Sequence, residues 1–291
     1  MLAWRFAQSG GYAAGVPSWS SIEGPLLFAH RGASAERPEN TLAAFELGLE
    51  LGADVLELDV HPSRDEVLIV SHDPDALRNA GVARALADCD WAEIAAWDAG
   101  FGFQDSSGQR PFAGRGLGLP RFDDVLAALP NALFNVDVKL AREHELRSLL
   151  ATIRSRQAES RVLLTSFSSE VLGLARSLRY DGPIGLAESE VRRLVMSPAF
   201  LTRWFPLAGS RVQIPVRSGR LDLSTARLID KCHRLKLAVD YWVINDPPEA
   251  ELLLARGADG IITDDTRTLA RLFASSPHTA AWRARHGTAH G

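Results

Sequence analysis

The sequence predicts a single-domain α/β protein in which parallel strands close into a barrel. Two observations favour this fold. After residue 139, short apolar runs alternate with helical patterns, which is typical of parallel βα units. The chain has 291 residues, and a barrel of this kind takes about 250 residues before its insertions are counted. One domain therefore accounts for the whole length.

We divide the chain into three parts by composition and periodicity. Residues 1–25 are rich in glycine, serine and aromatic residues without periodicity, so we expect an N-terminal arm that packs on the barrel. Residues 26–274 form the barrel. Within it, residues 74–119 are a long, partly glycine-rich and aromatic region that we expect to cover the barrel mouth. Residues 275–291 are polar, and we expect them to fray.

Nine apolar runs compete for the eight strand positions of the barrel. The predicted strands are Leu26–Ala29, Val55–Val60, Val67–His72, Ala132–Lys139, Arg161–Ser166, Pro183–Ala187, Arg211–Pro215, Ala238–Ile244 and Gly260–Thr263. The third run follows a polar turn centred near Asp65, so we expect it to be the extra strand, antiparallel to its neighbour. Helices are predicted at 42–51, 90–97 and 121–129.

The first strand and the hairpin carry most of the candidate chemistry. The first strand ends abruptly in His30 and Arg31, as a buried strand does where it delivers polar side chains to a barrel mouth. Glu57 and Asp59 are two residues apart on the next strand, so their carboxylates point to the same face. The hairpin would return His72 to the level of Asp59.

Buried carboxylates need compensation, because an unpaired charge away from water is costly. One possibility is a structural ion-pair cluster of Arg31 with Glu57 and Asp59. The other is a cation site. Titratable side chains that converge at strand ends are more often functional, so we favour the cation site.

An ordered series of short motifs resembles the glycerophosphodiester phosphodiesterase family. The series consists of HRG at 30–32, PENT at 38–41, the E-x-D pair at 57–59, HD at 72–73, N-x-D-x-K at 135–139, TSF at 165–167, WVIND at 242–246 and DGIITD at 259–264. The resemblance covers most of residues 26–272. It implies an irregular TIM-type (β/α)8 barrel, and an enzyme that hydrolyses glycerophosphodiesters to glycerol 3-phosphate and an alcohol.

The resemblance also implies a metal site. Glu57, Asp59 and Asp137 would hold one divalent cation, Mg²⁺ or Ca²⁺, because an all-carboxylate set favours these hard cations over zinc. Asp137 stands where the family normally has glutamate, and the shorter side chain would require a shifted metal or a bridging water.

In this interpretation, His30 and His72 form the general acid and base pair, since a pKa of about 6.5 suits both roles at neutral pH. The sequence leaves open which of them is the base. Arg31 and Lys139 would contact the phosphoryl oxygens. In the family, the glycerol 2-hydroxyl of the substrate is thought to attack phosphorus, and water then opens the cyclic phosphate. Strand alternation also places His61 on the carboxylate face.

Two implied substrate-binding residues, Asn40 and Trp242, have a second interpretation. The resemblance places Glu39 and Asn40 at the mouth of the site, although Asn40 or Thr41 also suits the N-cap of the helix that follows. Trp242 would form an apolar wall for the glycerol carbons, although a buried tryptophan usually belongs to the core.

Bulk properties argue against several other classes. The net charge of −4 gives no basic surface for nucleic acid or anionic membrane. No apolar run reaches the roughly 18 residues of a membrane span, and the N-terminus makes a poor secretory signal. Cys89 and Cys232 match neither a metal nor a redox pattern, so we interpret them as free thiols of a cytoplasmic protein.

Two other functions stay open on the sequence alone. A lysophospholipase D acting on lipid substrates would need an apolar rim, for which Phe101, Phe103 and Phe112 are candidates. A non-catalytic phosphate-binding barrel would not need an acid and base pair. The sequence also leaves open the alcohol head group, the choice between Mg²⁺ and Ca²⁺, and the oligomeric state.

Overall fold

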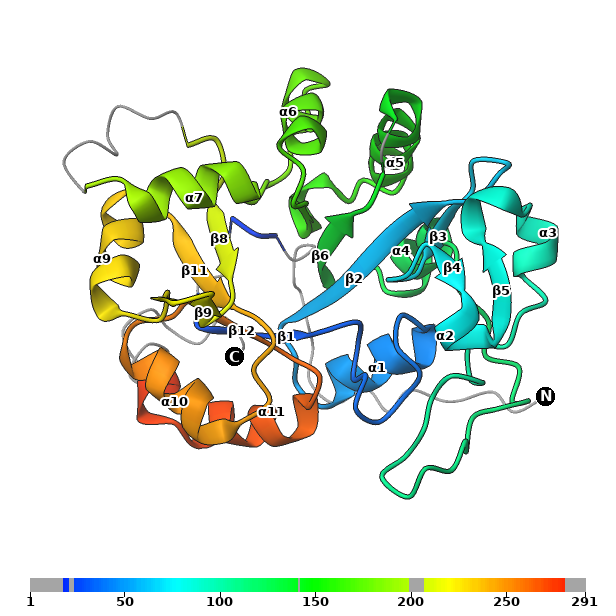
Figure 1. The fold of residues 1–291 in the computed structure, drawn as a ribbon, viewed down its shortest axis with the longest axis horizontal. Helices are drawn as coiled ribbons and strands as arrows, with labels where there is room; N and C mark the ends of the chain where they lie inside the picture. Colours follow the sequence, from blue (N-terminus) through cyan, green and yellow to red (C-terminus); the bar gives the residue numbers. More distant parts are fainter. Residues whose placement is uncertain (1–17, 21–23, 141, 199–206, 281–291) are drawn as a thin grey trace.

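The computed structural model of the chain describes residues 18–20, 24–140, 142–198 and 207–280, and it has parallel strands at its centre with helices around them (Figure 1). The barrel strands are β1 (Leu26–Ala29), β2 (Val55–Pro62), β6 (Leu133–Val138), β7 (Val162–Thr165), β8 (Arg211–Ile214), β11 (Ala238–Tyr241) and β12 (Gly260–Thr263). The longer helices are α1 (Leu42–Glu50), α4 (Phe122–Ala128), α5 (Glu143–Ser155), α6 (Ser169–Ser177), α7 (Glu188–Met196), α9 (Ala226–Arg234), α10 (Pro247–Ala255) and α11 (Thr266–Ser275).

The seven strands hydrogen-bond in the order β7-β6-β2-β1-β12-β11-β8, all in parallel. Two residues close the ring between the end strands. Ile184 forms a parallel bridge with Leu164 of β7, and Gly185 forms one with Arg211 of β8. The predicted strand at 183–187 is therefore reduced to two bridging residues, which complete the ring of strands. The predicted α/β barrel is confirmed.

The extra strand lies where the hairpin pattern predicts it. β3 (Leu68–Val70) pairs antiparallel with the end of β2, with His61 opposite Ile69, so the turn is centred at Asp65. The backbone N–H of Ser71 donates to the carbonyl of Asp59 at 3.1 Å. His72 therefore lies one residue beyond the level of Asp59, at the top of the barrel.

Strand alternation makes the lower interior of the barrel apolar and its mouth polar. On β2, Leu56 and Leu58 face outward into the core shared with the helices. Val55 belongs to a small interior cluster with residues of β1, β6 and β12, whereas Glu57 and Asp59 line a cavity above it. The same division holds on β6, where the polar positions face the cavity.

A buried ion pair and two aromatic rings close the opposite end of the barrel. Arg211 forms a forked pair with Asp240, and its guanidinium lies 5.4 Å from the ring centroid of Trp19 and 5.7 Å from that of Phe28. A Cβ on Gly260 would collide with Asp240, so glycine is required there. Of the predicted arm, residues 1–17 and 21–23 lie outside the described residues.

Short polar side chains start several helices. Thr41 caps α1, because its hydroxyl accepts a hydrogen bond from the N–H of Ala44 at 3.3 Å. This resolves the ambiguity at the PENT motif, since Asn40 is not the cap. Ser168, Thr225, Asp246 and Asp265 cap α6, α9, α10 and α11 in the same way.

Residues 74–119 form a small annex beside α1 (Figure 1). It contains β4 (Asp75–Ala76), α2 (Leu77–Ala80), β5 (Val82–Ala85), a 3-10 turn at 86–88 and α3 (Trp91–Ile94). The annex has its own apolar cluster, which includes Leu86, Cys89 and Ile94.

The tail is ordered further than expected. Ser276 and Thr279 are buried, and the hydroxyl of Thr279 donates to the carbonyl of Phe273 at 2.6 Å. The prediction of fraying from residue 275 is therefore wrong for the first residues of the tail, and residues 281–291 lie outside the described residues. Among the described helices, none combines the length and the apolar character that crossing a membrane requires.

Candidate active site

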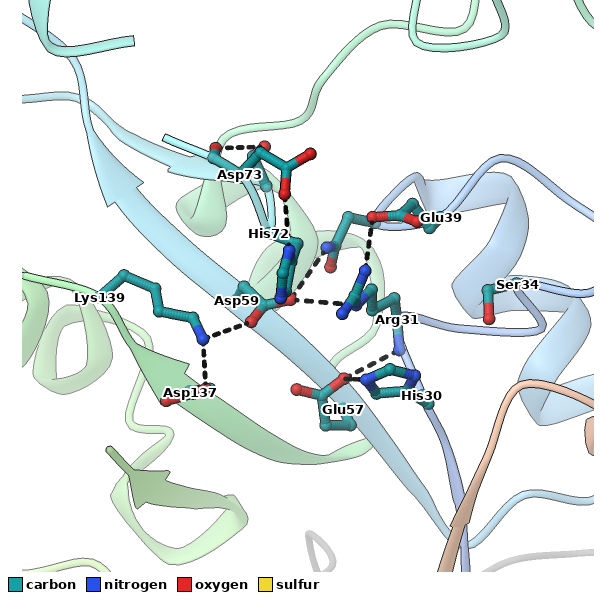
Figure 2. A network of polar contacts seen from close by, with 12 residues as sticks. His30, Arg31, Ser34, Glu39, Glu57, Asp59, His72, Asp73, Asp137 and Lys139 are labelled. Atoms are coloured by element: carbon teal, nitrogen blue, oxygen red, sulfur yellow. Dashed lines mark hydrogen bonds and ion pairs between the residues drawn. The ribbon is translucent and has the colours of Figure 1, made fainter. Parts of the chain in front are cut away.

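One cavity of about 600 Å³ lies at the carboxyl ends of the barrel strands. Most of the predicted site residues line it, namely His30, Arg31, Glu57, Asp59, His72, Asp137, Lys139 and Trp242. The two histidines therefore flank a common space whose floor carries the three carboxylates (Figure 2).

The turn after β1 is built around residues with left-handed backbone. Arg31, Gly32 and Asn40 have φ values of 57°, 81° and 56°. A Cβ on Gly32 would press against the backbone of Ala44 in α1, and asparagine tolerates the left-handed region better than most residues. This path aims the N–H of Arg31 at a carboxylate oxygen of Glu57, 2.9 Å away.

Glu39 and Asn40 stand behind the cavity wall and support residues that line it. Glu39 accepts a hydrogen bond from the guanidinium of Arg31 at 3.0 Å, and the amide of Asn40 donates to Asp59 at 3.2 Å. Burial alone would raise the pKa of Glu39, but Arg78 and Arg31 hold it below its ordinary value. These contacts position Arg31 and Asp59. Direct contact of Glu39 and Asn40 with a substrate stays a prediction.

His30 is held by a carboxylate from the far end of the chain. Its Nδ1 lies 2.6 Å from Oδ1 of Asp264, just beyond β12, and Asp264 also accepts hydrogen bonds from Ser34 and Asn245. Although burial works in the other direction, His30 and these two donors lower the pKa of Asp264 to about 2. Burial lowers the pKa of His30, but Glu57 and Asp264 outweigh it, so that this pKa lies above the ordinary value.

His72 is held in a similar way. Its Nδ1 lies 2.7 Å from Oδ1 of Asp73, whose other oxygen accepts a hydrogen bond from Arg78 at 2.6 Å. Nε2 of His61 lies 3.0 Å from the carbonyl oxygen of His72. Burial lowers the pKa of His61, so its ring stays neutral at pH 7 and donates this hydrogen bond. His61 thus supports His72 from behind.

Arg78 connects the two sides of the mouth. Its guanidinium donates to both oxygens of Glu39 at 2.7 Å and, through Nε, to Asp73 at 2.6 Å. Glu39 in turn holds Arg31, and Asp73 holds His72. One side chain from the annex therefore fixes both supporting carboxylates.

Sheet register brings the floor carboxylates together. Asp59 on β2 is paired with Asp137 on β6, and both side chains face the cavity. Nζ of Lys139 lies 2.6 Å from Asp137 and 3.3 Å from Asp59 (Figure 2). Burial, reinforced by the charges of Asp59 and Asp137, raises the pKa of Glu57 to about 8, and burial also raises the pKa of Asp137. Lys139 therefore compensates the acidic floor only in part.

The donors at the floor fit a hard cation. Oδ1 of Asp137 is a buried acceptor without a hydrogen-bond partner, and the raised pKa of Glu57 marks a shortage of positive charge. Within the described ranges, no three His, Cys, Asp or Glu side chains already converge as a ligand cluster. Lys139 lies between two of the carboxylates, so a cation would compete with Nζ for their oxygens.

The annex lies beside the mouth, and none of its residues lines the cavity, so the prediction that it covers the mouth is not supported. The aromatic residues expected to form a rim are engaged within it. Phe103 and Phe112 stack edge-to-face at 5.0 Å, and the guanidinium of Arg110 lies 4.2 Å from the ring centroid of Phe101.

Sequence reasoning missed several supporting residues. The histidines are positioned by Asp73, Arg78, Asn245 and Asp264. Three of these lie in the motifs given above, but the sequence assigned a supporting role to none of them. The rule that polar residues at strand ends gather at the barrel mouth could have identified Asp264, which directly follows β12. No local signal points to Arg78.

Comparison with known proteins agrees with the motif series. The profile of the Glycerophosphoryl diester phosphodiesterase family matches residues 30–268. A probable glycerophosphodiester phosphodiesterase of Mycobacterium tuberculosis is 30% identical, covering 83% of this chain and 88% of its own length. A lysophospholipase D of Rattus norvegicus is 28% identical, covering 81% and 82%. An Oleispira antarctica phosphodiesterase, solved with the product sn-glycerol-3-phosphate, has a TM-score of 0.72 at 21% identity, covering 87% and 98%.

Replacing Glu57 by Gln should change how stability depends on pH in the absence of metal. Folded Glu57 keeps its proton up to a pKa of about 8, whereas the unfolded chain releases it near 4.5, so rising pH destabilises the wild-type fold across this window. The amide has no such proton. The free energy of unfolding of Glu57→Gln, taken relative to that of the wild type, should therefore rise by more than about 1 kcal/mol between pH 4.5 and about pH 8.

Urea unfolding in EDTA at both ends of the window measures this difference. A difference that does not change with pH would mean that Glu57 is already ionised in the fold. Adding Mg²⁺ or Ca²⁺ should stabilise the wild type more than the variant, because the variant lacks one carboxylate of the floor.

Proposed function

Because the chain belongs to the glycerophosphoryl diester phosphodiesterase family, we propose that it hydrolyses glycerophosphodiesters to glycerol 3-phosphate and an alcohol. The observation that carries this proposal is the placing of His30 and His72, each with a carboxylate on Nδ1, around one cavity with an acidic floor. The free cysteines are buried, which favours a cytoplasmic setting.

Charge neutralisation comes first, since the phosphodiester is anionic and the alkoxide is a poor leaving group. Glu57, Asp59 and Asp137 would hold one divalent cation, Mg²⁺ or Ca²⁺, which when bound supplies positive charge to the phosphoryl oxygens. Arg31, fixed by Glu39, would contact the same oxygens. Lys139 lies close enough to the floor to contact these oxygens as well.

Proton transfer falls to the two histidines. With Nδ1 hydrogen-bonded to a carboxylate, each ring would accept or donate a proton in the cavity through Nε2. The carboxylate stabilises the imidazolium that forms. One histidine takes the proton of the attacking hydroxyl as the new P–O bond forms. The other gives a proton to the alcohol oxygen as the old P–O bond breaks. Reversal of these roles would let water open a cyclic phosphate.

A non-catalytic phosphate-binding barrel accounts for this site less well. Recognition of a phosphate needs only donors such as Arg31 and Lys139. It needs neither two oriented imidazoles nor a floor of three carboxylates, which would repel an anion. General acid and base catalysis accounts for the two imidazoles, and a bound cation would account for the carboxylates.

The test is release of choline from glycerophosphocholine by His30→Ala and His72→Ala. Each variant should lose at least about 100-fold in kcat, because it lacks one proton-transfer group, and circular dichroism should show an intact fold. The matched control is His144→Ala, which removes an exposed histidine paired with Glu66 away from the cavity. Wild-type turnover by both site variants would refute the proposal.

Arg78 should matter through the residues it positions. Arg78→Met frees Asp73 and Glu39, so we expect kcat to fall by about 10-fold or more, as is common for supporting residues. Stability should change by less than about 1 kcal/mol, since the guanidinium is half-exposed.

The matched control for Arg78 is Arg84→Met, an arginine of the same annex that pairs with Glu93. It should leave kcat unchanged. Arg78→Lys should restore little, because an ammonium cannot span both carboxylates as the guanidinium fork does. Unaltered kcat in Arg78→Met would show that the histidine and Arg31 hold their positions without it.

A further inference from the structure

The positive charge of the chain is concentrated in one stretch. Residues 188–236 contain ten arginine or lysine residues and four aspartate or glutamate residues, a balance of +6. The whole chain has a net charge of −4, so the remainder carries −10. The stretch includes α7, α9 and the small hairpin of β9 (Arg217–Ser218) and β10 (Leu221–Asp222), which lie together on the left of Figure 1.

Several of these positive charges have no partner. The exposed arginines of the stretch include Arg193, Arg217, Arg220 and Arg227, and within the described ranges none of the four forms an ion pair. Only Arg217 has a carboxylate close by, that of Asp222 on the facing strand of the hairpin. This side of the molecule therefore presents a positive potential to solvent.

The same side carries exposed apolar side chains. Phe167, Met196 and Leu221 have 59%, 68% and 49% of their surface accessible, and all three border the cavity. Leu221 directly follows Arg220, and Met196 lies three residues beyond Arg193 on α7, nearly one helical turn away. Apolar side chains and unpaired arginines thus alternate over one surface. We call these three residues and the four arginines the docking face.

The docking face matches the chemistry of an anionic bilayer. Peripheral proteins lie on such a membrane with apolar side chains in the boundary between head groups and acyl chains, and with arginine or lysine beside the lipid phosphates. Nucleic acid would be contacted through the arginines alone, which leaves the exposed methionine and leucine without a role. A protein interface gathers its apolar area in a core depleted of charge, which this face lacks.

We propose that the docking face binds the protein peripherally to membranes rich in anionic lipid. The four arginines would lie at the level of the lipid phosphates, and the three apolar side chains would enter the boundary beneath them. One edge of the cavity mouth would then face the bilayer, while the annex on the other side of the molecule would face water (Figure 1). This corrects the interpretation of the net charge, which averages out a local concentration. Such docking does not depend on the proposed function.

Co-sedimentation of the full chain with sucrose-loaded vesicles tests the proposal. The partition coefficient on phosphatidylcholine vesicles that contain about 30% phosphatidylglycerol should be at least about tenfold higher than on phosphatidylcholine alone, because each arginine at an anionic surface contributes about fivefold. Raising the ionic strength from about 0.1 M to about 1 M should remove most of this difference, since the Debye length falls to about 3 Å. Equal binding to both kinds of vesicle would overturn the proposal.

Substitutions separate the two contributions to binding. Arg220→Ser should lower the partition coefficient on anionic vesicles about fivefold, because one phosphate contact is lost. Met196→Ser should lower it at least about threefold, because less apolar surface is buried. The matched controls are Arg115→Ser in the annex and Leu252→Ser on α10, which are exposed positions outside the docking face and should bind as the wild type does.

The remaining outcomes each decide the matter. Controls that weaken binding as much as the docking-face variants would mean that vesicles attract the protein without a defined face, and this would overturn the proposal, as would docking-face variants that bind like the wild type. Duplex DNA that displaces the protein from anionic vesicles, equally well with Met196→Ser, would assign the face to nucleic acid instead. Vesicle binding through this face without hydrolysis of any glycerophosphodiester would support the docking and refute the proposed function alone.

Discussion

Three carboxylates share the mouth of this barrel, and their repulsion in a place poor in water is the constraint on which the rest of the site depends. The parallel register of β2 and β6 sets Asp59 beside Asp137, and strand alternation adds Glu57 to the same face. Burial makes this arrangement costly, as the raised pKa of Glu57 records. Lys139 offsets part of the cost, and a divalent cation would offset the remainder.

The side chains around the site hold its charged groups in position. Asp264 and Asp73 each fix one histidine, and Arg78 ties Asp73 to Glu39. Such supporting partners select the tautomer and direction of an imidazole more firmly than the backbone alone can. At the opposite end of the barrel, aromatic rings surround the buried pair of Arg211 and Asp240.

Much of this could be predicted because the signals are local. The alternation along 55–60 and 133–138 gives both strands and the inward carboxylates, and the turn at Asp65 gives the hairpin. Most strand ends agree within two residues. The exception is β11, which ends at Tyr241 and not at the predicted Ile244. The roles of Glu39 and Asn40 could not be read locally, because they depend on which side chains face them. Arg78 meets Glu39 across 39 positions, and Asp264 meets His30 across 234.

The central claim is that the acidic floor binds a divalent cation, and a crystal of the protein soaked in manganese chloride tests it most directly. Manganese takes the same oxygen ligands as magnesium and gives an anomalous signal. We predict one anomalous peak within bonding distance of oxygens from Glu57, Asp59 and Asp137, with Nζ of Lys139 moved away from Asp59. A cavity without such a peak, with Lys139 still between Asp59 and Asp137, would contradict the account.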